Sequence, residues 1–151
     1  MVSEHSIRRT VEFSETDMAG IMHFSNYFRW MESAETAFLR SLGVPLINFV
    51  PGQVVGWPRV SATCDYRAPL RFGDEVEVKV LVKELRTRAI VFLFQFRKVV
   101  DGQVEAPLVS RGEIVAVCVT DDGKGGMMAQ PIPDVVRSKI AAAPKDAWAE
   151  G

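Results

Sequence analysis

An acidic residue in a glycine-containing loop is the first candidate for chemistry in this sequence. Asp17 lies in the run SETDMAGIMHF, three residues before Gly20 and shortly before a segment with helical periodicity. The first turn of a helix presents unpaired amide N–H groups and the positive end of the helix dipole. Such amides polarise a carbonyl group, and a carboxylate beside them can act as nucleophile or general base. The alternative on spacing alone is that Asp17 only accepts hydrogen bonds from amides of its own loop.

Other titratable side chains follow the same loop. His23 is one of two histidines, and it either faces a substrate or packs and caps at the helix start. No other His or Cys lies at ligand spacing from it, and the sequence has no Gly-x-Ser-x-Gly motif, which argues against a metal site and a serine triad. Glu32 and Glu35, one helical turn apart, are either paired catalytic carboxylates or ordinary charged residues of a helix surface.

A basic cluster is the second kind of candidate. Arg86 and Arg88 lie beside an expected turn between two strands, with Lys83 just before them. Guanidinium groups form charge-assisted hydrogen bonds to phosphates, so this cluster suits a phosphorylated ligand; solvated charges at a strand end are the alternative. The run from Gly123 to Gly126 lacks the Gly-Lys-Ser/Thr ending of a P-loop, and we expect a flexible loop there.

The elements that position these residues follow from the hydropathy pattern. Loose alternation from Ile7 to Phe13 predicts a first strand. Apolar residues then recur at three- and four-residue intervals, which predicts one long helix over about 25–42 that Gly43 and Pro45 end. A short helix is predicted over Asp134–Ala142, after a loop rich in proline.

Residues 54–120 are predicted to consist mainly of strands joined by turns at Gly73-Asp74 and Asp101-Gly102. Because the strands follow one another closely, an antiparallel meander is the simplest pairing. One amphipathic helix against one antiparallel sheet is an α+β architecture. The alternating segments are 61–67, 76–82, 92–96 and 113–120.

Composition and charge limit the classes of partner. The 151 residues suit a single domain spanning 1–151, and the formal net charge of -1 gives no field that would attract nucleic acid. No apolar run approaches the roughly 18 residues that a membrane span needs. Cys64 and Cys118 belong to no CxxC pair, so we expect both to be buried thiols of a reducing compartment, and the cytoplasm is the expected location.

The run VEFSETDMAGIMHFSNYFRWMESA, residues 11–34, resembles the signature of the 4-hydroxybenzoyl-CoA thioesterase family of hotdog-fold proteins, which includes acyl-CoA thioesterases of the Tol-Pal operon type. The resemblance rests on Thr16-Asp17-x-x-Gly20 with Asn26-Tyr27 and Trp30 downstream. It covers roughly residues 5–120 and includes the segments DYRAPLRFGDEVEV and KELRTRAIVF. The implied fold is an antiparallel sheet wrapped around one long central helix.

The resemblance implies a role for each candidate residue. The family's catalytic aspartate falls on Asp17, and backbone amides at the helix start polarise the thioester carbonyl. Arg86 and Arg88 fall where the family contacts the phosphates of CoA. Glu32 is a minor candidate, since a related clade uses a helix glutamate. The expected oxyanion and acyl pocket comprises Gly20, His23, Phe24, Ser25, Asn26 and Tyr27.

The resulting functional prediction is hydrolysis of an acyl-CoA thioester to free acid and CoA. No metal or other cofactor is expected, because CoA is part of the substrate. A curved sheet leaves exposed edges, and the fold commonly joins edge to edge, so we expect a homotetramer or at least a dimer with the active site between subunits. A hotdog hydratase or dehydratase and a non-catalytic acyl-CoA-binding module are the alternatives. The sequence does not specify the acyl group.

Overall fold

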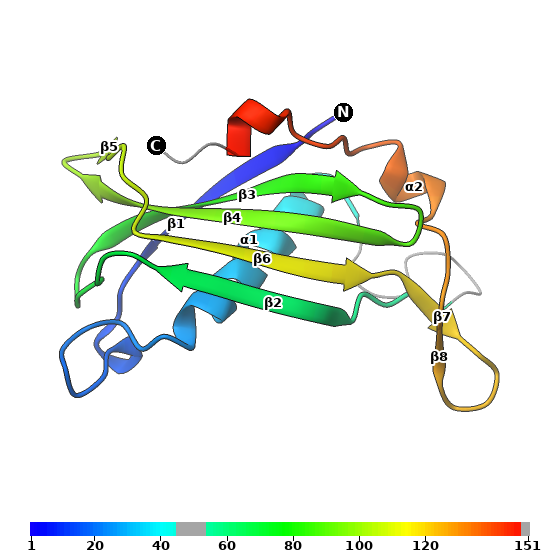
Figure 1. The fold of residues 1–151 in the computed structure, drawn as a ribbon, viewed down its shortest axis with the longest axis horizontal. Helices are drawn as coiled ribbons and strands as arrows, with labels where there is room; N and C mark the ends of the chain where they lie inside the picture. Colours follow the sequence, from blue (N-terminus) through cyan, green and yellow to red (C-terminus); the bar gives the residue numbers. More distant parts are fainter. Residues whose placement is uncertain (45–53, 149–151) are drawn as a thin grey trace.

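The computed structural model describes residues 1–44 and 54–148, which form an antiparallel sheet with a helix across one face (Figure 1). The strands run in the spatial order β1-β3-β4-β6-β2, and a two-residue strand pairs with the C-terminal end of β4. The α+β hotdog architecture predicted from the sequence is therefore confirmed. The strands of this sheet are β1 (Glu4–Thr10), β2 (Arg59–Tyr66), β3 (Glu75–Leu85), β4 (Ala89–Val100), β5 (Gln103–Val104) and β6 (Ser110–Val117).

Helix α1 (Asn26–Ser41) confirms the predicted long helix within one residue at each end. It ends where Gly43 takes a φ of 72°, a left-handed conformation that glycine adopts without a Cβ clash. Pro45, the other predicted stop signal, lies outside the described residues. The side chains of α1 that are buried are those of Tyr27, Trp30, Met31, Ala34, Glu35, Phe38 and Leu39.

The sheet packs against α1 through alternate residues of its central strands. The four even-numbered valines of β3 (Val76–Val82) are fully buried, and so are Phe94 and Phe96 of β4. The sulfur of Met31 lies where a Cβ on Gly112 of β6 would be, so this glycine permits the close approach of helix and sheet. The core is thus the layer between α1 and the inner face of the sheet.

The position of β2 corrects the predicted meander. Strands β3, β4 and β6 do follow one another across the sheet, but β2 pairs with β6 at the far edge rather than with β3. After β1, the chain crosses the face of the sheet as α1, so the next strand arrives at the opposite edge (Figure 1). Seven of the eight residues of β2 are exposed, as its edge position requires.

Two predicted element boundaries are also wrong. The first strand ends at Thr10, and Phe13 lies in the 3-10 turn η1 (Phe13–Glu15) with 75% of its surface exposed. The C-terminal helix α2 (Asp134–Arg137) is shorter than predicted, because Ile140 leaves the helical path to pair with Val2 beside the N-terminus.

The remaining described elements form a small hairpin and a last 3-10 turn. Strands β7 (Val119–Asp121) and β8 (Met127–Ala129) enclose the glycine-rich loop, and η2 (Lys145–Trp148) packs on the outer face of the sheet. The predicted turn at Asp101-Gly102 is confirmed, since both residues have positive φ and join β4 to β5. Of the helices that the structure describes, none is long and apolar enough to cross a membrane.

Candidate active site

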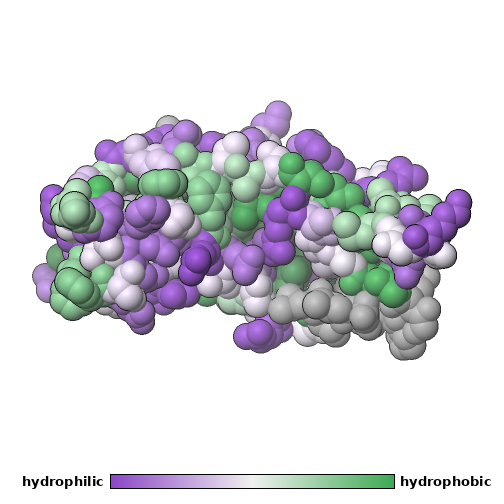
Figure 2. Space-filling model, turned by 90° about the horizontal axis from the view of Figure 1, so that it is seen from below, coloured by the Kyte–Doolittle hydropathy of each residue, from purple (hydrophilic) through white to green (hydrophobic). Residues whose placement is uncertain are grey.

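A pocket of about 320 Å³ lies between the loop before α1 and the end of β2. We call it the Asp17 pocket. Asp17 supplies its carboxylate, and most of the other lining side chains are apolar or aromatic. Figure 2 views the molecule from the side on which the loop before α1 lies. Apolar surface is visible at the left end of this view, where that loop is found in Figure 1. The lining residues are Asp17, Ile21, Met22, Phe24, Tyr27, Tyr66, Arg67, Ala68 and Pro69.

Asp17 is held by its own loop but retains one uncommitted oxygen. Its Oδ1 accepts the amide of Ala19 at 2.9 Å, and its carbonyl accepts the amide of Gly20 at 2.9 Å. Gly20 closes this turn with a φ of 80°. Within the described residues, Oδ2 accepts no hydrogen bond. Asp17 therefore does accept a hydrogen bond from an amide of its own loop, as the alternative from spacing predicted. This bond uses one carboxylate oxygen and leaves the other available to the pocket.

Glu15 connects the loop to the helix, a role that no sequence pattern indicated. One carboxylate oxygen accepts the indole N–H of Trp30 at 2.8 Å, and the other accepts the amide of Glu12 at 2.9 Å. Its backbone carbonyl accepts both the side-chain amide of Asn26 and the amide of His23. These contacts fix the start of α1 relative to the loop that carries Asp17.

The backbone amides at the helix start differ in whether they already donate a hydrogen bond. The amide of Ser25 donates to Nδ1 of His23, and that of Asn26 donates to the carbonyl of His23. The amide of Phe24, a residue that lines the Asp17 pocket, donates no hydrogen bond within residues 1–44 and 54–148. The amide of Tyr27, which also lines the pocket, likewise donates no hydrogen bond within the described residues, so Phe24 and Tyr27 are the predicted oxyanion residues with available donors.

His23 has a local packing arrangement. Its Nδ1 lies 2.7 Å from the Ser25 hydroxyl, and its ring stacks on Phe24 with centroids 4.4 Å apart. It is absent from the lining of the Asp17 pocket within one chain. His23 thus packs against Phe24 and Ser25 at the helix start.

Two tyrosines close the far side of the pocket. Tyr66 at the end of β2 donates its hydroxyl to the carbonyl of Phe24 at 2.8 Å, and its ring meets Tyr27 edge to face. Burial raises the pKa of Tyr27 to about 12 and raises the pKa of Tyr66 as well. Both hydroxyls are therefore protonated at neutral pH, so that of Tyr66 remains a donor. Sequence reasoning missed Tyr66, because only the pairing of β2 at the sheet edge brings it here.

The predicted phosphate cluster lies at the other end of the sheet. The turn Arg86–Arg88 follows β3 directly. In the strand register, Tyr66 at the Asp17 pocket and Phe96 of β4 both pair with Ser110 of β6. The last residue of β3, Leu85, pairs instead with Ile90 of β4. At about 3.3 Å per residue, residues 90 to 96 of β4 place the turn roughly 20 Å from the pocket. One chain does not bring Asp17 and the two arginines together.

Glu32 and Glu35 also lie away from Asp17, on a second cavity of about 330 Å³ beside Arg59. Glu35 is 2% exposed, and its Oε1 pairs with Arg59 at 3.1 Å, while Oε2 accepts no hydrogen bond within the described residues. Burial raises the pKa of Glu35, and the Arg59 charge opposes that shift. Glu32 is exposed, as expected for a charge on a helix surface, whereas Glu35 is buried, so its interpretation as an ordinary surface charge is wrong.

The two cysteines lie in different environments, and neither is part of a disulfide. Cys118 is fully buried and Cys64 partly buried, and both are free thiols. Cys64 Sγ lies 3.1 Å from the Ser110 hydroxyl, and burial raises the pKa of this thiol. The part of the chain that the structure describes contains no group of three His, Cys, Asp or Glu side chains placed to hold a metal ion.

Comparison with known proteins agrees with this geometry. Residues 11–140 match the family model described as the thioesterase-like superfamily. The 4-hydroxybenzoyl-CoA thioesterase of Pseudomonas sp. (strain CBS-3) is 26% identical over 126 residues, which cover 82% of this chain and 89% of that protein. Its solved structure superposes with a TM-score of 0.74 at 25% identity, covering 90% of this chain and 99% of the other.

Two further relatives are similar. A solved gentisyl-coenzyme A thioesterase is 32% identical with a TM-score of 0.72, covering 88% of this chain and 99% of its own. A 1,4-dihydroxy-2-naphthoyl-CoA hydrolase of Prochlorococcus marinus (strain NATL1A) is 32% identical over 99 residues, 61% of this chain and 66% of that protein. The chain belongs to the thioesterase-like superfamily. Its enzymatic class is thioester hydrolase.

Proposed function

We propose that this enzyme hydrolyses acyl-CoA thioesters in the Asp17 pocket, with Asp17 as nucleophile or general base. The observation that carries the proposal is the pairing, within one pocket, of a carboxylate with an uncommitted oxygen and an open amide at the helix start. The named substrates of the relatives are CoA thioesters, which supports CoA as the leaving group.

The thioester carbonyl is polarised at the start of α1. Its oxygen accepts the amide of Phe24, where the helix dipole stabilises negative charge as the carbonyl carbon is attacked. Tyr66 donates a hydrogen bond to the Phe24 carbonyl, and the Glu15 carbonyl accepts the side-chain amide of Asn26 two residues further on. These contacts set the amide before the substrate arrives, so little reorganisation accompanies the reaction.

Asp17 has two routes to the products. It attacks the carbonyl carbon through Oδ2, the C–S bond breaks, CoA leaves as the thiolate, and water then hydrolyses the mixed anhydride to free acid. Alternatively, Asp17 takes a proton from water as that water attacks, and the proton passes to the departing sulfur. Both routes require a carboxylate, and neither uses a cofactor.

The phosphates of CoA are bound by Arg86 and Arg88 of a neighbouring subunit. The roughly 20 Å between these arginines and the Asp17 pocket within one chain favours this arrangement. β2 is an exposed edge strand with Tyr66 at one end and Arg59 at the other. Antiparallel pairing of two β2 edges brings the Tyr66 end of one copy beside the Arg59 end of the other, which is also the Arg86 end.

A homo-oligomer, a tetramer or at least a dimer, is the assembly that this arrangement requires. Light scattering at micromolar concentration is expected to give a mass of two or four chains, and a monomer there would contradict the two-subunit site. The free thiols of Cys64 and Cys118 support a reducing compartment, the cytoplasm.

The test of the proposed function is a panel of aromatic and aliphatic acyl-CoAs, scored by free thiol released. We expect thiol release above the buffer rate for at least one class of acyl group. A hydratase would change the acyl chain without releasing thiol, and a binding module would bind the esters without turnover. Either outcome across the whole panel would overturn the thioesterase mechanism.

A further inference from the structure

We infer that Arg137 is a positioning residue that holds the Arg86–Arg88 turn in the conformation that binds the phosphates of CoA. This inference rests on the proposed role of Arg86 and Arg88. It concerns a residue of α2, outside the signature region, and α2 lies at the opposite end of the sheet from the loop that precedes α1 (Figure 1).

The contact joins residues about 50 positions apart in the sequence. Nη2 of Arg137 donates to the backbone carbonyl of Arg86 and, at 3.2 Å, to that of Thr87. One guanidinium group thus bridges two successive carbonyls of the turn. A planar guanidinium suits this bridge, because it presents several N–H groups in fixed directions.

Two backbone amides of the same chain also bond to this turn. The amide of Ile132 donates to the carbonyl of Thr87 at 2.9 Å, and the amide of Cys118 donates to the carbonyl of Arg88 at 2.8 Å. All three carbonyls of the turn are therefore bonded to residues between 118 and 137. The turn would otherwise be an exposed hairpin loop, the kind of segment that is most mobile.

Arg137 itself is anchored. It lies at the end of α2, whose Val136 is fully buried in the main core, and Ile132 just before the helix is 3% exposed. The bridge consequently connects the turn to the packed interior rather than to another mobile loop. A brace of this kind restrains the backbone from which both arginine side chains extend.

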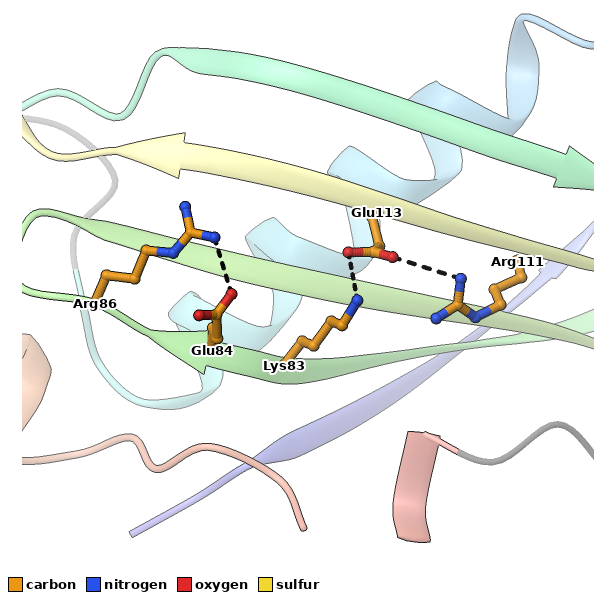
Figure 3. Close-up of polar contacts among 5 residues, drawn as sticks. All are labelled: Lys83, Glu84, Arg86, Arg111 and Glu113. Carbon is orange, nitrogen blue, oxygen red and sulfur yellow. Dashed lines mark hydrogen bonds and ion pairs between the residues drawn. The ribbon is translucent and has the colours of Figure 1, made fainter. Parts of the chain in front are cut away.

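The side chains of Arg86 and Arg88 remain exposed while their backbone is restrained. Figure 3 shows Arg86 directed along the outer face of the sheet, where its Nη2 meets Glu84 at 2.9 Å. Restraint of the backbone lowers the conformational freedom that the turn must lose when phosphate binds. Loss of Arg137 would therefore weaken ground-state binding of CoA and leave the reacting carbon unaffected.

The experiment compares Arg137→Ala with Arg86→Ala/Arg88→Ala on an acyl-CoA and on the same acyl group carried by pantetheine, which lacks the nucleotide phosphates. We expect Arg137→Ala to raise KM for the acyl-CoA several-fold with unchanged kcat, and to leave KM for the pantetheine ester unchanged. Arg137→Lys should recover part of the effect. Arg40→Ala, which removes an exposed arginine of α1, is the matched control.

Combining the variants tests whether Arg137 changes KM through the Arg86–Arg88 turn. If Arg137 acts through the turn, adding Arg137→Ala to the double variant raises KM no further, because coupled residues are not additive. An unchanged KM in Arg137→Ala, with a raised KM in the double variant, overturns this inference alone. An unchanged KM in the double variant overturns the phosphate role and the inference with it. A KM raised equally for both esters assigns Arg137 to general stability and also overturns the inference.

Discussion

At the Asp17 end of the sheet, the functional groups are fixed by contacts within a short stretch of chain, whereas at the Arg86 end they are fixed by a distant segment. Glu15 bonds to residues 12, 23, 26 and 30, so most of the hydrogen bonds that position the helix start join residues 12–30, and the bonds from Tyr66 to Phe24 and from Met22 to Leu70 are the long-range additions. The turn at Arg86 depends instead on residues 118, 132 and 137.

This difference has a functional meaning. A reacting carbonyl tolerates little displacement, since an error of about 1 Å can cost roughly a hundredfold in rate. Short-range contacts give that precision at the Asp17 end. In the proposed site, phosphates are bound by exposed, long side chains, which tolerate a less rigid backbone. We therefore expect that the chemistry and the binding of CoA can be disrupted separately.

The largest effect is expected at Asp17. Replacement by Asn keeps the acceptor for the Ala19 amide and removes the reacting carboxylate. We expect kcat to fall by on the order of 10² to 10⁴, the range typical of a positioned acid or base. Thiol release gives the rate, and thermal unfolding close to that of the wild type shows that the loop is intact. Near wild-type kcat in Asp17→Asn would move the chemistry to another residue.

A mixture of two defective chains tests whether the two ends meet across subunits. Arg86→Ala/Arg88→Ala should raise KM for acyl-CoA by roughly tenfold, from the loss of charge-assisted hydrogen bonds. Coexpression of this variant with Asp17→Asn creates mixed oligomers in which one site has a native Asp17 and native arginines. Activity with the wild-type KM should reappear. Its absence from purified mixed oligomers would show that both groups act within one chain.

A smaller effect is expected at Tyr66. Tyr66→Phe removes the hydrogen bond to the Phe24 carbonyl and keeps the ring against Tyr27. A hydrogen bond of this kind contributes about 1 kcal/mol, so kcat should fall roughly three- to tenfold with KM little changed. Tyr27→Phe is a matched control that removes a hydroxyl from the same pair of rings. A loss as large in Tyr27→Phe as in Tyr66→Phe would assign the effect to general packing.

The smallest effect concerns stability at the Arg86 end. Because the native pKa of Glu35 is raised above 4.5, its contribution to stability is full below pH 4.5 and is lost as pH rises through the native pKa. Glu35→Gln does not titrate. Relative to the wild type, this variant should therefore gain free energy of unfolding as pH rises. Urea unfolding across this range measures the difference, and parallel profiles would contradict a raised pKa.

Local patterns in the sequence predicted much of the Asp17 end. The helix over about 25–42 and the position of Asp17 in a glycine-containing loop just before it follow from periodicity and from a motif of adjacent residues. The predicted paired strands and the two-residue turn at Asp101-Gly102 have the same origin. Contacts between residues close in sequence are largely set by local conformation, so sequence reasoning reaches them.

Only the tertiary structure decided which distant segments meet. It placed β2 at the sheet edge, so Tyr66 reaches the pocket, and it turned Glu35 into a cavity beside Arg59. It also separated Arg86 from Asp17 and brought Arg137 to the turn. Periodicity identifies which face of a strand or helix is apolar, but it does not specify its neighbour. Strand order and long-range contacts depend on how all the apolar faces pack together, and no single segment contains that information.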